Sequence, residues 1–101
     1  MEELKDKIYA KLKKVYDPEI PVNIYDLGLI YDVQITALNE VVVLMTLTAP
    51  NCPEAINLPI EVENKIKEIP EVNQAKVIIT FDPTWDKDRM SEDAQMILGI
   101  F

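Results

Sequence analysis

Two apolar segments, residues 29–35 and 41–48, constrain the fold of this chain more than any other feature. In the first, LIYDVQI, every second side chain is apolar, so Asp32 and Gln34 point to the opposite face. The second, VVVLMTLT, begins as a β-branched run that is apolar on both faces. Only a short polar connection at 37–40 separates them. We therefore expect the two segments to form an antiparallel hairpin within a small β-sheet.

Amphipathic helices are predicted on either side of this hairpin. In residues 2–16, apolar side chains recur at spacings of three and four, and two prolines then prevent the helix from continuing. A second helix is expected to end near Ile69, but Pro59 interrupts its pattern. Either this helix kinks at Pro59, or a short turn at 53–57 precedes a new start with Pro59 at the first helical position.

The last part of the chain predicts one more strand and a short helix. Residues 75–81 form the strand, with Val77, Ile79 and Phe81 on one face, and Ser91 caps the helix. The expected fold class is α+β, a two-layer α/β sandwich in the order α-β-β-α-β plus a short C-terminal helix. Its small mixed sheet of about three strands carries helices on one face. The pairing of the third strand stays open. The length of 101 residues predicts one domain, 1–101.

The charge of the chain restricts its partners. Eighteen acidic residues against ten basic ones give a net charge of −8, which repels the phosphates of nucleic acids and anionic lipids. The opening MEELKDKIYAKLKK carries charges throughout and does not resemble a signal peptide, and no run of about 18 apolar residues exists to span a bilayer. With a single cysteine, these features predict a cytoplasmic protein that binds neither nucleic acid nor membrane.

Cys52 is the only cysteine, and it lies within TAPNCPEA, where a strand should end and a helix begin. If Pro53 takes the first helical position, Cys52 is the N-cap and its sulfur lies among unpaired backbone N–H groups. Their positive potential favours the thiolate, the form that attacks or binds metal. The alternative is equally open, because a free cysteine often packs as a small buried hydrophobe.

Three polar residues are candidate neighbours of Cys52. Thr48 ends the second strand four residues earlier and either approaches the sulfur or makes a local backbone bond. Asp26 either holds the backbone N–H groups of a turn or supplies a carboxylate that ligates iron or holds a proton. Asp17 is the weakest of the three, since it also suits a residue that merely precedes the turn at Pro18.

The loop DPTWDKDRM, residues 82–90, is a separate candidate for binding a partner protein. Its Trp85, Arg89 and Met90 would then form an exposed patch. The competing interpretation is that Trp85 and Met90 close the core, as such side chains more often do.

Several familiar chemistries are excluded. The chain has no histidine, which removes Cys–His nucleophilic catalysis and His-ligated zinc. It has no Cys-x-x-Cys pair for a thioredoxin-type centre, and its two glycines cannot build a phosphate-binding loop.

Three segments together resemble a known family. They are DPEIPVNIYDLGLIYDV (17–33), VLMTLTAPNCPEA (43–55) and FDPTWDKDRMSEDA (81–94). In this order they are similar to the small iron–sulfur assembly domain family that includes SufT and PaaD proteins, as a stand-alone single domain. The resemblance covers essentially the whole chain and implies the α-β-β-α-β order with a further C-terminal helix. It also implies a role in maturing iron–sulfur proteins, either by carrying iron or a cluster or by escorting targets.

The resemblance also implies site residues. The cysteine of the family corresponds to Cys52, its strand-end threonine to Thr48, its acidic residue before Leu-Gly-Leu to Asp26, and its Asp-Pro start to Asp17. Many relatives have glycine just before this cysteine, where this chain has Asn51, which also tolerates left-handed backbone.

Coordination chemistry limits how a cluster can be held. Iron–sulfur clusters usually take four cysteine ligands, and one copy of this chain offers one. We therefore expect no tightly bound cofactor: Cys52 handles iron or an Fe–S cluster transiently, or a homodimer shares two Cys52 thiolates. The expected partners are the iron–sulfur assembly machinery and client apo-proteins. The alternatives are an adaptor that docks clients through the Trp85 loop and, less favoured, a thiol or redox enzyme.

Overall fold

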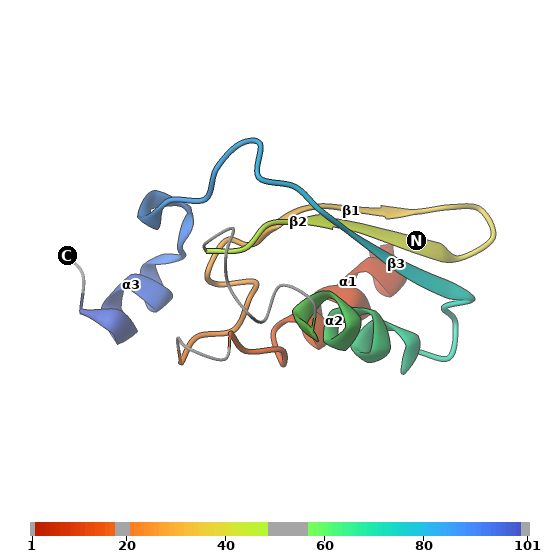
Figure 1. Ribbon diagram of the computed structural model, residues 1–101. Helices are drawn as coiled ribbons and strands as arrows, with labels where there is room; N and C mark the ends of the chain where they lie inside the picture. The colour runs from red at the N-terminus through yellow and green to blue at the C-terminus, as the bar shows by residue number, and fades with distance from the viewer. Residues whose placement is uncertain (1, 18–20, 49–56, 100–101) are drawn as a thin grey trace.

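The computed structural model describes residues 2–17, 21–48 and 57–99. Along the chain the elements are α1 (Glu2–Leu12), β1 (Ile30–Ile35), β2 (Glu40–Met45), α2 (Asn57–Lys67), β3 (Gln74–Ile79), the 3₁₀ turn η2 (Lys87–Arg89) and α3 (Glu92–Leu98). Figure 1 shows α1 and α2 on one face of the sheet, and α3 beyond the end of the sheet. The predicted α+β fold, with a small mixed sheet and helices on one face, is confirmed.

The sheet has the strand order β1-β2-β3, with β2 in the centre. β1 runs antiparallel to β2, and the turn between them places Asn39 in the left-handed region at φ 58°. The Thr36 N–H donates to the Glu40 carbonyl oxygen across 2.9 Å and closes this predicted hairpin. β3 pairs with β2 and runs parallel to it, which settles the partner of the third strand. A parallel neighbour requires a crossover, and α2 supplies it.

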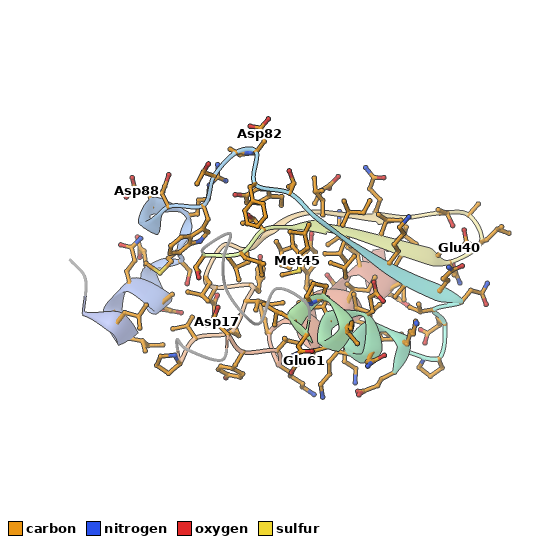
Figure 2. All side chains as sticks on the ribbon, in the orientation of Figure 1. Asp17, Glu40, Met45, Glu61, Asp82 and Asp88 are labelled. Atoms are coloured by element: carbon orange, nitrogen blue, oxygen red, sulfur yellow. The ribbon has the colours of Figure 1, made fainter. Side chains whose placement is uncertain are left out.

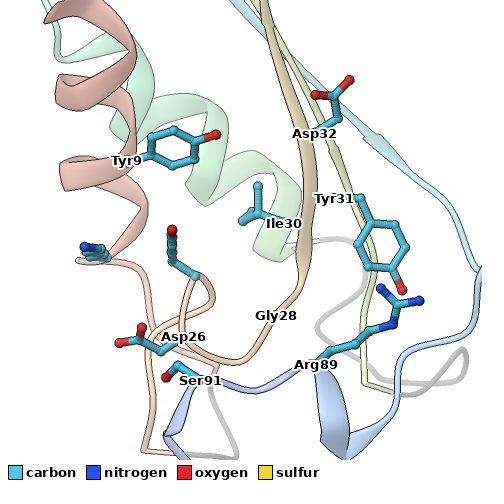
Figure 3. Close-up of a pocket in the computed structure, with 10 residues that line it drawn as sticks. Tyr9, Asp26, Gly28, Ile30, Tyr31, Asp32, Arg89 and Ser91 are labelled. Carbon is cyan, nitrogen blue, oxygen red and sulfur yellow. The ribbon is translucent and has the colours of Figure 1, made fainter. Parts of the chain in front are cut away.

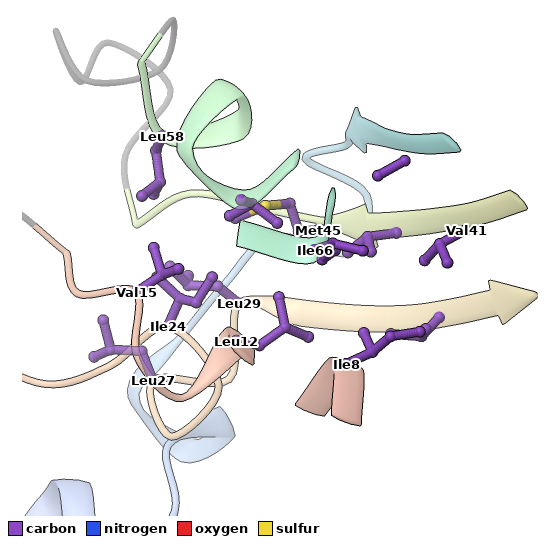
Figure 4. Packing of buried hydrophobic residues seen from close by; sticks show 14 of the residues in the cluster. Ile8, Leu12, Val15, Ile24, Leu27, Leu29, Val41, Met45, Leu58 and Ile66 are labelled. Atoms are coloured by element: carbon purple, nitrogen blue, oxygen red, sulfur yellow. The ribbon is translucent and has the colours of Figure 1, made fainter. Parts of the chain in front are cut away.

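The core lies between the sheet and the two long helices (Figure 4). α2 presents a buried residue at every fourth position, and β2 buries every second one, as their periods require. Fully or nearly fully buried members of these elements include Ile8, Leu12, Val41, Val43, Met45, Leu58, Val62 and Ile66. In Figure 2, Met45 lies inside this layer, whereas the carboxylates of Glu40, Glu61 and Asp82 lie at the periphery.

The boundaries of both long helices differ from the predicted ones. α1 ends at Leu12 rather than near residue 16, because the chain turns and Tyr16 pairs with Asn23 in an isolated bridge. In the described residues α2 begins at Asn57 and contains Pro59 in its first turn. The missing N–H of Pro59 costs nothing there, because the first N–H groups of a helix have no partner within it. The turn expected at 53–57 falls mostly outside the described residues.

A β-bulge corrects the predicted face of β1. The pairing register shifts between Ile30, opposite Met45, and Asp32, opposite Leu44, so Tyr31 is the extra residue. As a result Ile30, rather than Tyr31, packs against the core. Strict alternation had assigned Tyr31 to the apolar face, and that prediction was wrong, because a bulge inverts the alternation locally.

The third strand is shorter than predicted. β3 ends at Ile79, and the Thr80 N–H still donates to the Met45 carbonyl oxygen across 2.9 Å. Beyond that bond the chain leaves the sheet, and Phe81 is 39% exposed. The expectation that the strand continues to Phe81 was therefore wrong.

Candidate functional site

The C-terminal segment (residues 82–91) is docked on the loop formed by residues 23–28. The Trp85 indole Nε1–H donates to the Leu27 carbonyl oxygen across 2.6 Å. The Ser91 N–H donates to the Asp26 carbonyl oxygen across 2.8 Å. Two parts of the chain that are more than fifty residues apart thus hold each other in place.

Glycine is required where these two parts touch. Gly28 has φ +79°, and a Cβ atom added to it would stand 2.7 Å from the carbonyl carbon of Arg89. Such a distance is an overlap, so only a residue without a side chain fits between the loop and the C-terminal segment. The glycine in the Asp-Leu-Gly sequence of this loop therefore has a steric explanation.

Asp26 itself is held by its own turn. Its N–H donates to Asn23 Oδ1 across 2.9 Å, and Asn23 Nδ2 donates back to Asp26 Oδ2 across 2.8 Å. This reciprocal pair is a turn-stabilising arrangement. One carboxylate oxygen of Asp26 already accepts a hydrogen bond from a neutral donor.

A cleft of about 430 Å³ opens where the loop, the end of α1, the start of β1 and the C-terminal segment meet. Its wall includes Tyr9, Lys13, Tyr25, Asp26, Tyr31 and Arg89. In Figure 3, Tyr9 points toward Ile30 across the opening, and Arg89 extends from the C-terminal segment to the ring of Tyr31. The volume is that of a small-molecule or side-chain pocket.

Both cations of the cleft rest on tyrosine rings. Lys13 Nζ lies 4.9 Å from the centroid of Tyr25, and the Arg89 guanidinium carbon lies 4.8 Å from the centroid of Tyr31. The rings of Tyr9 and Tyr25 meet edge to face, with 5.4 Å between their centroids. Cation–π contacts of this kind hold a cation in position without neutralising its charge.

The carboxylate of Asp32 also accepts hydrogen bonds from its own segment. Its Oδ1 accepts from the Val33 N–H across 3.0 Å, and its Oδ2 accepts from Gln34 Nε2 across 3.1 Å. These bonds satisfy a backbone donor of β1, which is an edge strand of the sheet. The carboxylate therefore protects the edge.

The structure describes only some of the predicted site residues. Cys52 and Asn51 fall outside the described residues. Thr48 is half-buried and lies three residues past the end of β2, and Asp17 is buried at 8% exposure. Within residues 2–17, 21–48 and 57–99, no group of three or more His, Cys, Asp or Glu side chains is arranged to hold a metal ion. The proximity of Thr48 and Asp26 to Cys52 stays a prediction.

The expected partner patch around Trp85 needs a correction. Met90 is only 6% exposed and belongs to the core, and Trp85 is half-buried with its indole bonded to Leu27. Of the three predicted residues, only Arg89 is exposed. A thioether and an indole that can reach core neighbours are more stable there than in water, so the competing, core-closing interpretation holds for Met90.

Sequence reasoning missed the cleft itself. Its tyrosines and cations come from four separate parts of the chain, and no local pattern joins them. A weak signal existed in the recurrence of Tyr25 and Tyr31 on either side of Gly28.

No helix among the described residues is long and apolar enough to cross a membrane.

Comparison with known proteins gives consistent matches. Residues 5–77 match a sequence family described as iron–sulfur cluster assembly protein. A Porphyromonas gingivalis protein named Fe-S protein maturation auxiliary factor is 51% identical over 94 residues, which cover 93% of this chain and 90% of that protein. The Bacillus subtilis Fe-S protein maturation auxiliary factor YitW is 40% identical over 99 residues, or 98% and 97% of the two chains.

The solved structures agree with the sequence matches. A crystal structure from Bacillus anthracis, described as a domain of unknown function, DUF59, superposes with a TM-score of 0.92 at 40% identity. The superposition covers 99% of this chain and 95% of the other. The resemblance seen in the three sequence segments is thereby confirmed.

Proposed function

Because this chain belongs to the iron–sulfur cluster assembly protein family, we propose that it is an auxiliary factor in the maturation of iron–sulfur proteins. One observation carries the proposal. The chain matches proteins named maturation auxiliary factors at 51% and 40% identity over nearly the full length of both partners. An auxiliary factor assists the delivery of a cluster and needs no reaction of its own, so we propose a non-enzymatic role.

We infer that Cys52 is the residue through which iron or a cluster is handled. A thiolate is the usual protein ligand of iron–sulfur clusters, and the chain has one. The described residues, which do not include Cys52, contain no ready-made set of ligands for a metal ion. Cargo held by one thiolate needs ligands from elsewhere, such as a client, a small thiol or a second copy of the chain. Such shared coordination suits transfer better than storage.

The proposed partners are the iron–sulfur assembly machinery and client apo-proteins. The net charge of −8 supports protein partners over nucleic acids, since phosphate backbones are bound by surplus lysine and arginine. The reducing cytoplasm, which keeps a lone thiol available, is the proposed compartment.

The maturation role is tested in cells that lack the gene. We expect an iron–sulfur enzyme purified from these cells to contain less iron and sulfide per chain than the same enzyme from wild-type cells. Re-expression of the protein should restore the content, and a cluster-free enzyme in the same cells should be unaffected. Full cluster content without the gene would refute the role under those growth conditions.

The role of Cys52 is tested on the purified protein. Iron and acid-labile sulfide are measured after anaerobic reconstitution for wild type, Cys52→Ala and Thr48→Val. Loss of both elements in Cys52→Ala alone would identify the thiolate as a ligand. A ratio near one [2Fe–2S] unit per two chains would indicate a bridged dimer. Equal contents in wild type and Cys52→Ala would exclude Cys52 as the ligand.

A further inference from the structure

The cleft beside β1 is lined by two cations, Lys13 and Arg89, and by the carboxylates of Asp26 and Asp32. In the described residues, the ion pairs join Lys7 to Glu71, and both Lys11 and Lys65 to Glu68. Neither Lys13 nor Arg89 takes part in an ion pair with an acidic residue that the structure describes. Two cations in the same cleft thus keep their charge available.

In the part of the chain that the structure describes, the two carboxylates of the cleft form no ion pair with these cations. Asp26 accepts from Asn23, and Asp32 accepts from the Val33 N–H and from Gln34. One oxygen of Asp26 and both oxygens of Asp32 thus accept from neutral donors of their own segments. A ligand that enters the cleft therefore meets Lys13 and Arg89, which carry only donors, beside Tyr9 and Tyr25, whose hydroxyls can also donate.

Both cations are held ready for such a ligand. The rings of Tyr25 and Tyr31 support them at 4.9 and 4.8 Å, and the hydroxyl of Tyr31 donates to the Pro83 carbonyl oxygen across 2.7 Å. Arg89 is further fixed by the contact of its main chain with Gly28. Less conformational freedom is lost on binding when donors are already in position.

We propose that this cleft is a binding site for a carboxylate, held between Lys13 and Arg89. Arginine recognises the planar carboxylate with two parallel N–H donors, and lysine adds a point charge. A phosphate dianion suits the cleft less, because Asp26 and Asp32 leave the cleft with no net positive charge and the chain as a whole is at −8. A monoanionic group with an apolar body matches the tyrosine rings and Ile30.

The carboxylate has two sources that the same chemistry would accept, a free organic acid or an acidic side chain of a partner protein. The first depends only on the cleft. The second rests on the proposed function, since a client or assembly protein would then be anchored beside the loop that carries Asp26. The proposal uses Lys13 and Arg89 of the cleft, whereas the proposed metal chemistry uses Cys52.

The test follows the backbone and arginine side-chain NMR signals of the full, ¹⁵N-labelled chain during titrations. The probes are 3-phenylpropionate, an acetylated and amidated hexaglutamate, inorganic phosphate and the matching hexalysine peptide. Variants are Lys13→Gln and Arg89→Gln, with Lys5→Gln as the matched control, because Lys5 is an exposed residue of α1 outside the cleft. Arg89→Lys keeps the charge but removes the paired donors. Circular dichroism checks that each variant is folded.

We expect saturable shifts at Gly28, Tyr31 and Arg89 with a carboxylate probe, and a loss of affinity of about tenfold for each cation removed. Lys5→Gln should bind like wild type. Tighter binding of 3-phenylpropionate would identify a free acid, and tighter binding of hexaglutamate a protein partner. The proposal is overturned if neither carboxylate binds saturably, if phosphate or hexalysine binds as tightly, or if Lys5→Gln loses as much affinity as Arg89→Gln. These results leave the cellular maturation test untouched, so the two failures are distinguishable.

Discussion

Gly28 and Arg89 approach so closely that no side chain fits between them: a Cβ atom at position 28 would lie 2.7 Å from the Arg89 carbonyl carbon. This contact joins the loop of Asp26 to the C-terminal segment, and the bond from Trp85 to Leu27 reinforces it. The proposed carboxylate site depends on the same contact, because it positions Arg89 over Tyr31.

Replacement of Gly28 should lower the free energy of unfolding for two separable reasons. Gly28→Ala places an alanine at φ +79°, which costs about 1–2 kcal/mol, and adds an overlap with Arg89 that costs about 1–3 kcal/mol. Gly99→Ala is the matched control, since Gly99 has φ +66° but nothing within 4 Å of its added Cβ. Urea unfolding should therefore show the larger loss of unfolding free energy for Gly28→Ala. Equal losses would mean that the contact with Arg89 relaxes freely.

The ion pair between α1 and the start of the α2–β3 connection should make stability depend on pH. A hydrogen bond from Lys11, 2.8 Å long, and its charge hold the pKa of Glu68 below its ordinary value of 4.5. A carboxylate with a lowered pKa stabilises the fold above the unfolded-state value and loses this contribution as the pH falls through the folded-state pKa. Lys11→Gln should therefore be less stable than wild type at pH 7, with a difference that shrinks below about pH 4.5.

This dependence is measured as the urea midpoint across a pH series at low salt. Lys5→Gln serves as the control, because Lys5 takes no part in the ion pairs of the described residues. A stability difference between Lys11→Gln and wild type that stayed constant from pH 7 to pH 3 would show that the pair does not titrate as described.

At each edge of the sheet, a carboxylate accepts a hydrogen bond from an outward backbone N–H. Asp32 accepts from Val33 on β1, and Glu63 of α2 accepts from the Val77 N–H of β3 across 2.9 Å. Removal of the second acceptor by Glu63→Ala should lower the unfolding free energy by about 1–2 kcal/mol and expose an edge to other chains.

Concentration-dependent light scattering compares Glu63→Ala with Glu61→Ala, an exposed position of the same helix. We expect self-association only in Glu63→Ala. Equal scattering of the two variants would show that Glu63 does not guard the edge.

Local patterns predicted the elements well, and long-range contacts account for what they missed. The alternation of β1 and the spacing of Leu12 and Val15 correctly identified a strand and buried positions, because strand and helix periods act over a few residues. The bulge at Tyr31 could not be predicted, since it arises from the register with β2. The same holds for the bond from Trp85 to Leu27.

The candidate site divides in the same way. Cys52 was identified from chemistry and resemblance alone, and its surroundings lie outside the described residues. Met90 was considered for a partner surface, but its burial depends on tertiary packing that sequence spacing does not contain. The cleft between Lys13 and Arg89 required the folded chain, because its walls come together only when residues 82–91 dock on residues 23–28.

The central claim, that this protein promotes iron–sulfur maturation through Cys52, is tested most directly by the cluster content of a client in cells that carry only Cys52→Ala. The iron and sulfide content per client chain is compared with that in cells expressing wild type at equal protein level. We predict that Cys52→Ala gives the low content of cells without the gene. Content equal to wild type would contradict the account and leave the protein, at most, as an adaptor that needs no thiol.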